Sequence, residues 1–259
     1  MFFNFFKKSA PVEVEQRAKS IQNYDDVSQI AEYFKNETGV TFDKQTSILK
    51  NKVMTFCKHR EIDSFRELLN SLNYDNALKQ ALIDTLTTNE TFFYREFKQI
   101  EELVALVKKN NQKVEILCAP SATGEEPYSI AIALLESGVS AENFKIIGVD
   151  INQEAINRAK DALYKERNIR NLNAEQLRKY FKDDNGLYRL NDSVKSRVTF
   201  RVANIFDSSF SGMGKFDYIF CRNMLIYFDK ETKLRAKKIL QELRKNQNQE
   251  IFFGHADLF

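Results

Sequence analysis

The chain has 259 residues, a formal net charge of +3 and a charged fraction of 29%. This length suffices for one large or two modest domains whose core needs no disulfides. The small net charge excludes a uniformly basic surface that follows nucleic acid, so a charged partner must meet a local patch. The 3 cysteines form no C-x-x-C pair and there are 2 histidines, which predicts a reduced, intracellular protein without a metal site.

No stretch of about eighteen apolar residues occurs, so we expect no membrane-spanning helix. Residues 1–9 are apolar first and basic afterwards, which is the reverse of a signal peptide. We therefore expect a cytoplasmic protein without stable membrane insertion, whose first aromatic residues pack on the body of the protein.

Residues 1–86 place apolar side chains at helical spacing and predict a small all-helical N-terminal domain. One helix is expected from Lys44 to about His59, with Asp43 as its N-cap. Its inward-facing residues should be Ile48, Leu49, Val53 and Phe56.

From about Lys113, short apolar runs alternate with helical patterns. The runs begin near Val114, Phe144, Val198, Phe216 and Ile251. This alternation predicts an α/β fold with a parallel sheet covered on both faces and a ligand at the carboxyl ends of the strands. Residues 172–196 interrupt it with a helix, a turn around Gly186 and a short strand, which predicts a small antiparallel insertion.

A nucleoside site is predicted after the first two strands. The first leads into a tight loop with Gly124 and then Glu125–Pro127, which open a helix. The loop lacks G-x-G-x-x-G, and acidic residues there would repel a pyrophosphate but tolerate the sulfonium and ammonium of S-adenosylmethionine. The second strand ends at Asp150, whose carboxylate can accept hydrogen bonds from a ribose diol. Alternatively, Asp150 or Asn152 caps the next helix.

Four segments, in the correct order, resemble the signatures of the CheR family of chemoreceptor glutamate methyltransferases. They are Thr87–Glu96 (TTNETFFYRE), Thr123–Ser129 (TGEEPYS), Gly148–Ile151 (GVDI) and Phe216–Phe228 (FDYIFCRNMLIYF). The resemblance covers essentially the whole chain, and four ordered matches are far more specific than one.

The resemblance implies a Rossmann-like class I methyltransferase domain with a parallel sheet over residues 113–259, with the insertion at about 172–196. It implies that residues 1–86 form a receptor-docking domain and that 87–112 form a linker covering the cofactor. The cofactor implied is S-adenosylmethionine, with S-adenosylhomocysteine as product.

The resemblance also implies residue roles. The cofactor-binding residues would be Asn89, Thr91, Arg95, Ala119, Glu125, Asp150, Asn204, Ile205, Arg222 and Asn223. The first three would close over the cofactor, the next three would contact its methionine and ribose, and Asn204 and Ile205 its adenine. Arg222, Asn223 and Tyr227 would line the pocket near the reactive methyl. Tyr227 and Arg95 are the expected catalytic residues, for shaping the methyl pocket and for orientation.

The chain departs from the family pattern in three places. Pro120 in the loop after the first strand removes one N–H. The insertion after Phe181 is short and contains a single glycine, so we expect no docking through a receptor's C-terminal pentapeptide. The sequence ends at Phe259, where relatives usually continue into a last antiparallel strand.

The expected partner is the cytoplasmic helical region of chemoreceptors, which the protein would meet as a monomer. Because that region is acidic, the resemblance favours a docking face formed by Lys50, Lys52, Lys58 and Arg60. The alternative is a solvated helix face.

Two rival functions remain at this stage. Methylation of nucleic acid is disfavoured because Cys221–Tyr227 lacks an Asn-Pro-Pro-Tyr motif for an exocyclic amine. A receptor adaptor that has lost turnover is the non-enzyme reading, motivated by Pro120 and the end of the sequence at Phe259.

Overall fold

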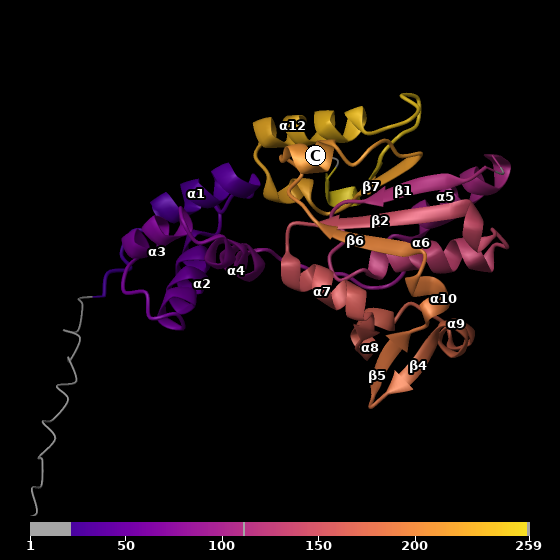
Figure 1. Cartoon of the computed structure of the whole chain (residues 1–259), viewed down its shortest axis with the longest axis horizontal. Coiled ribbons are helices and arrows are strands. Elements are labelled where there is room, and N and C mark those ends of the chain that lie inside the picture. The colour runs from indigo at the N-terminus through magenta and orange to yellow at the C-terminus, as the bar shows by residue number, and fades with distance from the viewer. Residues whose placement is uncertain (1–21, 111, 258–259) are drawn as a thin grey trace, which may run out of the picture.

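The computed structural model describes residues 22–110 and 112–257 and has a helical part followed by an α/β part (Figure 1). The predicted packing of the first aromatic residues lies outside the described residues. The helical part comprises α1 (Ser28–Thr38), α2 (Thr46–Lys58), α3 (Phe65–Leu72) and α4 (Asn76–Leu86). Its separate core draws buried side chains from all these helices, including Ile30, Phe34, Leu49, Val53, Leu68 and Leu82. The described part of the predicted helical region is therefore confirmed as helical.

Two details predicted for α2 were wrong. The helix begins at Thr46, and Gln45 at the N-cap position makes no side-chain capping bond, so Asp43 does not cap it. Ile48 is 49% exposed rather than inward, because its side of α2 faces a cavity between the two parts of the protein.

The α/β part is built on a five-stranded parallel sheet. In spatial order the strands are β6 (Val198–Val202), β2 (Phe144–Asp150), β1 (Val114–Cys118), β7 (Tyr218–Cys221) and β8 (Phe252–Phe253). The order reverses between β1 and β7, and a ligand crevice is expected outside the strand ends at such a switch point. The predicted Rossmann-like sheet is confirmed.

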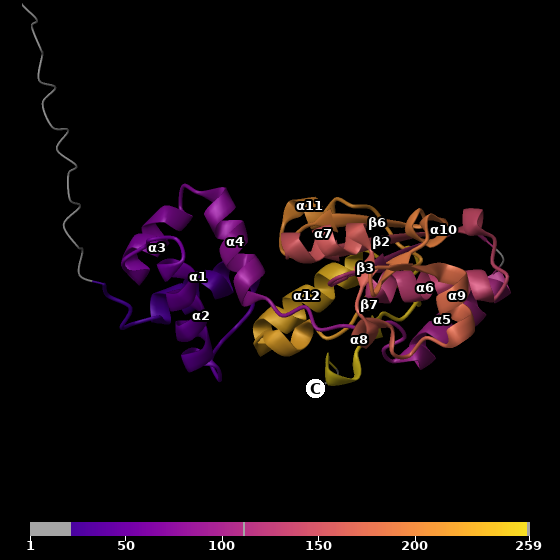
Figure 2. The same cartoon turned by 90° about the horizontal axis from the view of Figure 1, so that it is seen from below.

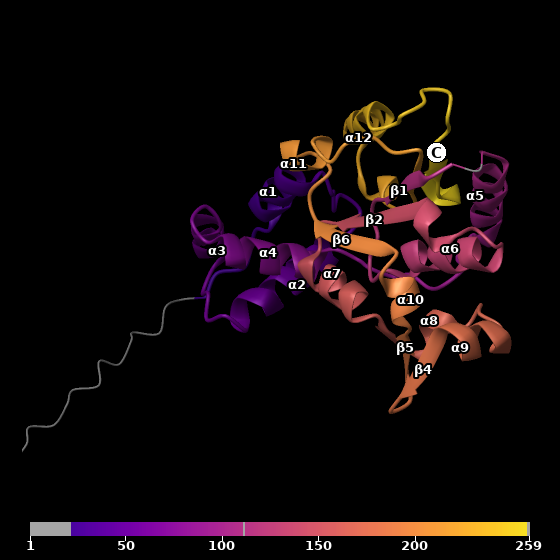
Figure 3. The ribbon, with the colours of Figure 1, turned by 45° about the vertical axis from the view of Figure 1, so that its right-hand side comes forward.

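Helices cover both faces of this sheet (Figures 1 and 3). Ile116 of β1 belongs to the core shared with α5 (Phe97–Asn110), α6 (Glu125–Glu136) and α7 (Gln153–Asp161). Its neighbour Leu117 belongs to the core shared with α11 (Ser208–Ser211) and α12 (Lys230–Glu242). Successive strand residues point to opposite faces, so burial on both sides explains why the strands are continuous apolar runs.

The segment predicted to be a linker is largely a helix of the α/β core. Ile100, Leu103 and Val107 of α5 are buried against α6 and the sheet, since they recur at helical spacing on one face. The non-helical connection is therefore limited to residues 87–96, which run from α4 along the α/β part (Figure 2).

A second, antiparallel sheet projects from the α/β part (Figure 3). Its strands are β3 (Leu163–Tyr164), β5 (Leu187–Leu190) and β4 (Phe181–Asp184). Asn185 and Gly186 join β4 to β5 with φ of 55° and 81°, as a two-residue hairpin turn requires. The antiparallel lobe is confirmed, but β3 lies before the predicted start at residue 172. Short helices accompany these sheets: η1 (Ala141–Asn143), α8 (Glu166–Ile169), α9 (Ala174–Tyr180) and α10 (Asp192–Lys195).

Hydrogen bonds fix the helical part against the strand ends of the α/β part. The Thr41 N–H donates to the Tyr227 carbonyl at 2.9 Å. The Asp84 carboxylate accepts the Gln153 N–H at 2.8 Å, and Lys35 pairs with Asp229 at 2.7 Å. Among the described residues, none of the helices combines the length and apolar character needed to cross a membrane.

Gly39, which ends α1, lies where the two parts pack together, so substituting it tests how closely they pack. Its φ is +77°, and a Cβ there would lie 2.5 Å from the Phe206 ring and 2.8 Å from Thr232 Cγ2. Gly138 has a φ of +82° with nothing within 4 Å of the same position. We expect Gly138→Ala to lower the free energy of unfolding by about 1–2 kcal/mol through the left-handed backbone alone. Gly39→Ala should lower the free energy of unfolding by about 1–3 kcal/mol more than that, because the added methyl group overpacks the junction. Urea denaturation measures both, and equal losses would show that the junction is loosely packed.

Candidate active site

The carboxyl ends of the sheet border a cavity of about 610 Å³ between the two parts of the protein. We call it the sheet-end cavity. Residues at or after the ends of β1, β2, β6 and β7 line it, namely Ala119, Asp150, Asn204, Ile205, Asn223 and Tyr227. Thr38, Ile48 and Lys52 line it from the helical part. Its size is that of a small-molecule site, and it lies where the strand order predicts a ligand.

Asp150 is the buried acid of this cavity, 5% exposed. One carboxylate oxygen accepts the Ala122 N–H at 2.8 Å and the other the Asn152 N–H at 2.9 Å. Burial raises the pKa of Asp150 to about 6, although these hydrogen bonds oppose the shift. Asn152 caps α7 through the Ala155 N–H at 2.7 Å. Of the two candidates for the N-cap, Asn152 is therefore the one used, and each Asp150 oxygen keeps acceptor capacity for a diol.

Glu125 borders a second cavity, of about 650 Å³, beside α7 and α8. Its carboxylate is buried and accepts hydrogen bonds from Thr123 Oγ1 at 2.6 Å and Asn168 Nδ2 at 2.8 Å. Burial raises the pKa of Glu125. Thr91 lines this second cavity, and Asn89 lines both cavities. Asp150 and Glu125 thus border two different cavities, and Asn89 lines both of them.

The region predicted to hold adenine combines one apolar and one amide side chain. Ile205 is buried and contributes apolar surface together with Phe210. Asn204 donates through Nδ2 to the Glu37 carbonyl at 2.6 Å and accepts the Phe206 N–H at 3.0 Å. One amide hydrogen of Asn204 therefore faces the helical part, and the second remains for a ligand.

Asn223 and Tyr227 form the wall of the sheet-end cavity after β7. Asn223 has a φ of 60°, and its N–H donates to the Asp257 carboxylate. Tyr227 ends η2 (Leu225–Tyr227), whose Ile226 N–H donates to the same Asp257 carboxylate at 3.2 Å. Asp257 in η3 (His255–Asp257) therefore fixes the backbone that presents both side chains.

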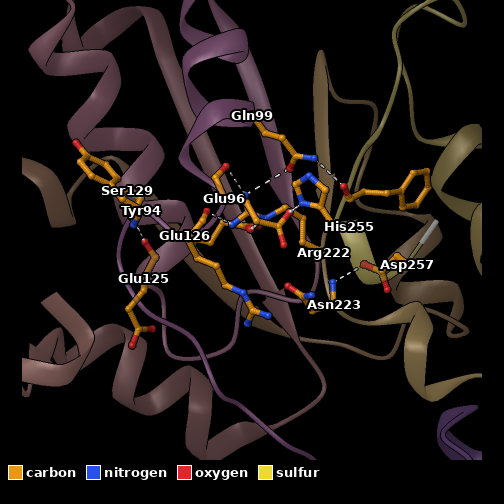
Figure 4. Close-up of polar contacts among 12 residues, drawn as sticks. Tyr94, Glu96, Gln99, Glu125, Glu126, Ser129, Arg222, Asn223, His255 and Asp257 are labelled. Atoms are coloured by element: carbon orange, nitrogen blue, oxygen red, sulfur yellow. Dashed lines mark hydrogen bonds and ion pairs between the residues drawn. The ribbon is translucent and has the colours of Figure 1, made fainter. Parts of the chain in front are cut away.

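Arg95 and Arg222 lie outside the residues that line the two cavities. Arg95 donates to the Glu90 carbonyl at 3.1 Å. Arg222 is 5% exposed and forms an ion pair with Glu126 (Figure 4). Asp150, Glu125 and Arg95 were expected to border one pocket, and the structure does not bring these three residues together around one cavity.

The four cations predicted to form a docking face are distributed around α2 and its end. Lys52 lines the sheet-end cavity. Lys50 donates to the Asp25 carbonyl at 3.0 Å, Lys58 lies 6.0 Å from the Tyr24 ring and Arg60 3.8 Å from the Phe56 ring. At about 100° of rotation per helical residue, Lys50 and Lys52 lie roughly 200° apart around α2. Arg60 lies beyond the end of the helix, so the four cations do not share one face.

Three residues that line or support the site were not given a role there from the sequence: Asn168 lines the second cavity, while Glu126 and Asp257 hold residues around the cavities. The second acid of Glu125-Glu126 was a visible signal, since an acid in a helix's first turn at a strand end can face inward. Asn168 and Asp257 had no signal, because they reach the site only through tertiary folding.

The described residues fit S-adenosylmethionine. Asp150 offers acceptors for the ribose hydroxyls and Ile205 an apolar surface for the adenine. The Glu125 carboxylate offers negative charge for an ammonium group. Among the described residues, no group of His, Cys, Asp or Glu side chains could hold a metal ion. A parallel sheet with these groups at its switch point is the architecture of a nucleoside-binding α/β enzyme.

Comparison with known proteins identifies the family. The model of the CheR methyltransferase, SAM binding domain, matches residues 89–259. The chemotaxis protein methyltransferase of Campylobacter jejuni subsp. jejuni serotype O:2 is 33% identical over 222 residues, covering 85% of this chain and 84% of that protein. That of Escherichia coli is 30% identical, covering 85% of this chain and 79% of that protein. The chain belongs to the CheR methyltransferase family, as its sequence motifs predicted.

The pKa of Asp150 predicts a pH dependence of cofactor binding. The carboxylate is ionised above its pKa of about 6, and protonation removes an acceptor for the ribose diol. We expect the Kd for S-adenosylhomocysteine to be constant above this pH and to rise by up to about tenfold per pH unit below it. Calorimetry across this range measures the effect.

Asp150→Asn serves as the control, because the pKa of the buried Glu125 is also raised. This variant should bind more weakly and lose the pH dependence. A pH dependence that persists in Asp150→Asn would assign the titration to another group.

Proposed function

We propose that this protein transfers a methyl group from S-adenosylmethionine to glutamate carboxylates in the cytoplasmic helical region of chemotaxis receptors. The supporting observation is the sheet-end cavity, which places Asp150, Asn223 and Tyr227 around one space open toward the helical part. The relatives from Campylobacter jejuni and Escherichia coli are named chemotaxis protein methyltransferases, which supports the proposal.

The reaction requires the protein to align the carboxylate oxygen with the methyl group, and it requires no proton transfer by the protein. A glutamate side chain has a pKa of about 4.3 and is already an anion at neutral pH. When bound, S-adenosylmethionine supplies a methyl group on a positively charged sulfur. The carboxylate oxygen forms the new bond to this carbon as the carbon–sulfur bond breaks, giving a methyl ester and S-adenosylhomocysteine. Holding the reacting groups in line can lower the barrier by roughly 7–11 kcal/mol.

The cavity residues divide this task. Asp150 and Ile205 hold the nucleoside end, while Glu125 and Thr91 are our candidates for the amino-acid end beyond Asn89. Tyr227 shapes the wall near the reacting carbon. Arg95 belongs to the covering segment and donates to the Glu90 carbonyl outside both cavities; it is our candidate for orienting the cofactor or the substrate carboxylate once they are bound.

The substrate helix docks at the mouth of the sheet-end cavity. Ile48 and Lys52 lie one turn apart at the start of α2, Lys44 lies just before the helix, and all three line this cavity. We call these three residues the docking stripe. Ile226 on the opposite wall is 41% exposed. Two cations beside exposed apolar side chains suit an acidic, amphipathic helix. The tight two-residue β4–β5 turn supports docking without a pentapeptide tether.

Methyl transfer from labelled cofactor to receptor-bearing membranes tests this function. We expect incorporated label to be released as methanol by mild base, because carboxylate methyl esters are base-labile. Label that resists base, or that transfers equally well to RNA, would assign another substrate. Cofactor binding without transfer would support the adaptor alternative.

Charge reversal at the cavity mouth tests the docking stripe. Lys52→Glu should raise the KM for receptor by roughly tenfold, because a like charge meets the acidic helix. Lys58→Glu, on the same helix but away from the cavity, is the matched control and should leave the KM nearly unchanged. Because Lys52 lines the sheet-end cavity, the Kd for S-adenosylhomocysteine is measured in both variants to separate a loss of receptor docking from a loss of cofactor binding. Equal effects on the KM would favour docking along the whole of α2.

A further inference from the structure

A buried ion pair lies at the switch point of the sheet. Glu126, in the first turn of α6, and Arg222, directly after β7, are 8% and 5% exposed and form an ion pair. Removing two charges from water is costly unless each finds good partners. Burial does raise the pKa of Glu126, and the Arg222 charge opposes that shift. The other partners of Arg222 therefore indicate which part of the structure this pair holds.

The remaining hydrogen bonds of Arg222 all go to one segment, residues 95–99 (Figure 4). Nη2 donates to the Arg95 carbonyl at 2.7 Å. Nη1 donates weakly to the Glu96 carbonyl and to Gln99 Oε1, each at 3.4 Å. Gln99 in turn donates through Nε2 to the Phe253 carbonyl at 2.7 Å. The guanidinium thus ties the start of α5 to the ends of β7 and β8.

This segment needs to be held, because its backbone is unfavourable. Tyr94 and Glu96 have φ of 56° and 50°, a left-handed conformation that residues other than glycine rarely adopt. The Tyr94 N–H donates to Ser129 Oγ at 2.9 Å, and the Glu96 carboxylate pairs with His255 at 3.0 Å. Each of the two residues is therefore fixed from the α/β part.

The held segment continues directly into the residues that border the cofactor cavities. Asn89 and Thr91 line them, and Arg95 follows. On its other side Arg222 precedes Asn223, which lines the sheet-end cavity. The ion pair therefore stands between two walls of the cofactor site, while neither of its members lines that site.

We propose that Glu126 is a positioning residue for cofactor binding. Its carboxylate neutralises and orients the Arg222 guanidinium, which fixes residues 95–99 and thereby sets the covering segment against the strand ends. Arg222 acts on the cofactor through this segment. The inference rests on the proposed cofactor site and adds Glu126, Gln99 and the route by which Arg222 contributes to it.

Glu126→Gln tests the proposal, because it keeps the side-chain shape and removes the charge. The matched control is Glu136→Gln at the other end of α6, which removes an exposed ion pair with Lys179. We expect the Kd for S-adenosylhomocysteine to rise roughly tenfold in Glu126→Gln and to stay unchanged in the control. Without ligand, the amides of residues 93–99 should exchange hydrogen faster in Glu126→Gln and at the normal rate in Glu136→Gln.

The measurements on Glu126→Gln distinguish a positioning role of Glu126 from a purely structural one. A purely structural role would lower the melting temperature and leave both the Kd and the local exchange rates unchanged, which would overturn the proposal. If Glu126→Gln fails to fold, Gln99→Met keeps the ion pair and should still raise the Kd and speed exchange in residues 93–99. An unchanged Kd in Gln99→Met would equally overturn it.

A double variant separates positioning from direct contact with the cofactor. If Glu126 and Arg222 act as a unit, Glu126→Gln/Arg222→Lys should bind no more weakly than the weaker single variant. Multiplied losses would mean that the residues act independently, against the proposal. The variants test this proposal only. Failure of the wild-type protein to bind S-adenosylhomocysteine or to transfer methyl groups would instead refute the proposed function.

Discussion

Five parallel strands end at the same edge of one sheet, and this constraint governs the chemistry of the protein. Backbone groups at the strand ends lack ladder partners, so the residues that follow each strand must satisfy them. Asp150 does so with two backbone N–H groups, Asp257 with the N–H groups of Asn223 and Ile226. Both carboxylates therefore stabilise the loops, and that of Asp150 also supplies charge to the sheet-end cavity. A polar cluster at the edge of an apolar sheet is the outcome.

The helical part packs against the carboxyl ends of the strands and is not a separate domain distant from the site. Thr41, Asp84 and Lys35 bond to the α/β part close to the strand ends. The sheet-end cavity consequently has one wall from each part. Under the proposed function, a substrate glutamate that enters between them would meet Lys52 of α2 on one side and the η2 wall on the other. Substrate docking would then be coupled to the place of methyl transfer.

The two buried carboxylates at the start of α6 have different partners, which suits them to different functions. Glu125 is satisfied by neutral donors, Thr123 and Asn168, which leaves its negative charge for a cationic ligand. Glu126, the next residue, is neutralised by Arg222. Two adjacent acids at one helix start thus face opposite sides of the loop, and their different partners account for their different proposed functions.

The sequence by itself determined the sheet, the helical region and the family. Buried strands on a parallel sheet must be continuous apolar runs, and the motifs around Gly124, Asp150 and Asn223 are local in the chain. It also placed Asp150 and Ile205 at strand ends, where the sheet brings them to one cavity. Local pattern could not tell that Ile48 faces that cavity, that α5 belongs to the α/β core, or that Arg222 is paired with Glu126. Those facts depend on which surfaces meet across long sequence separations, and only the tertiary structure decides them.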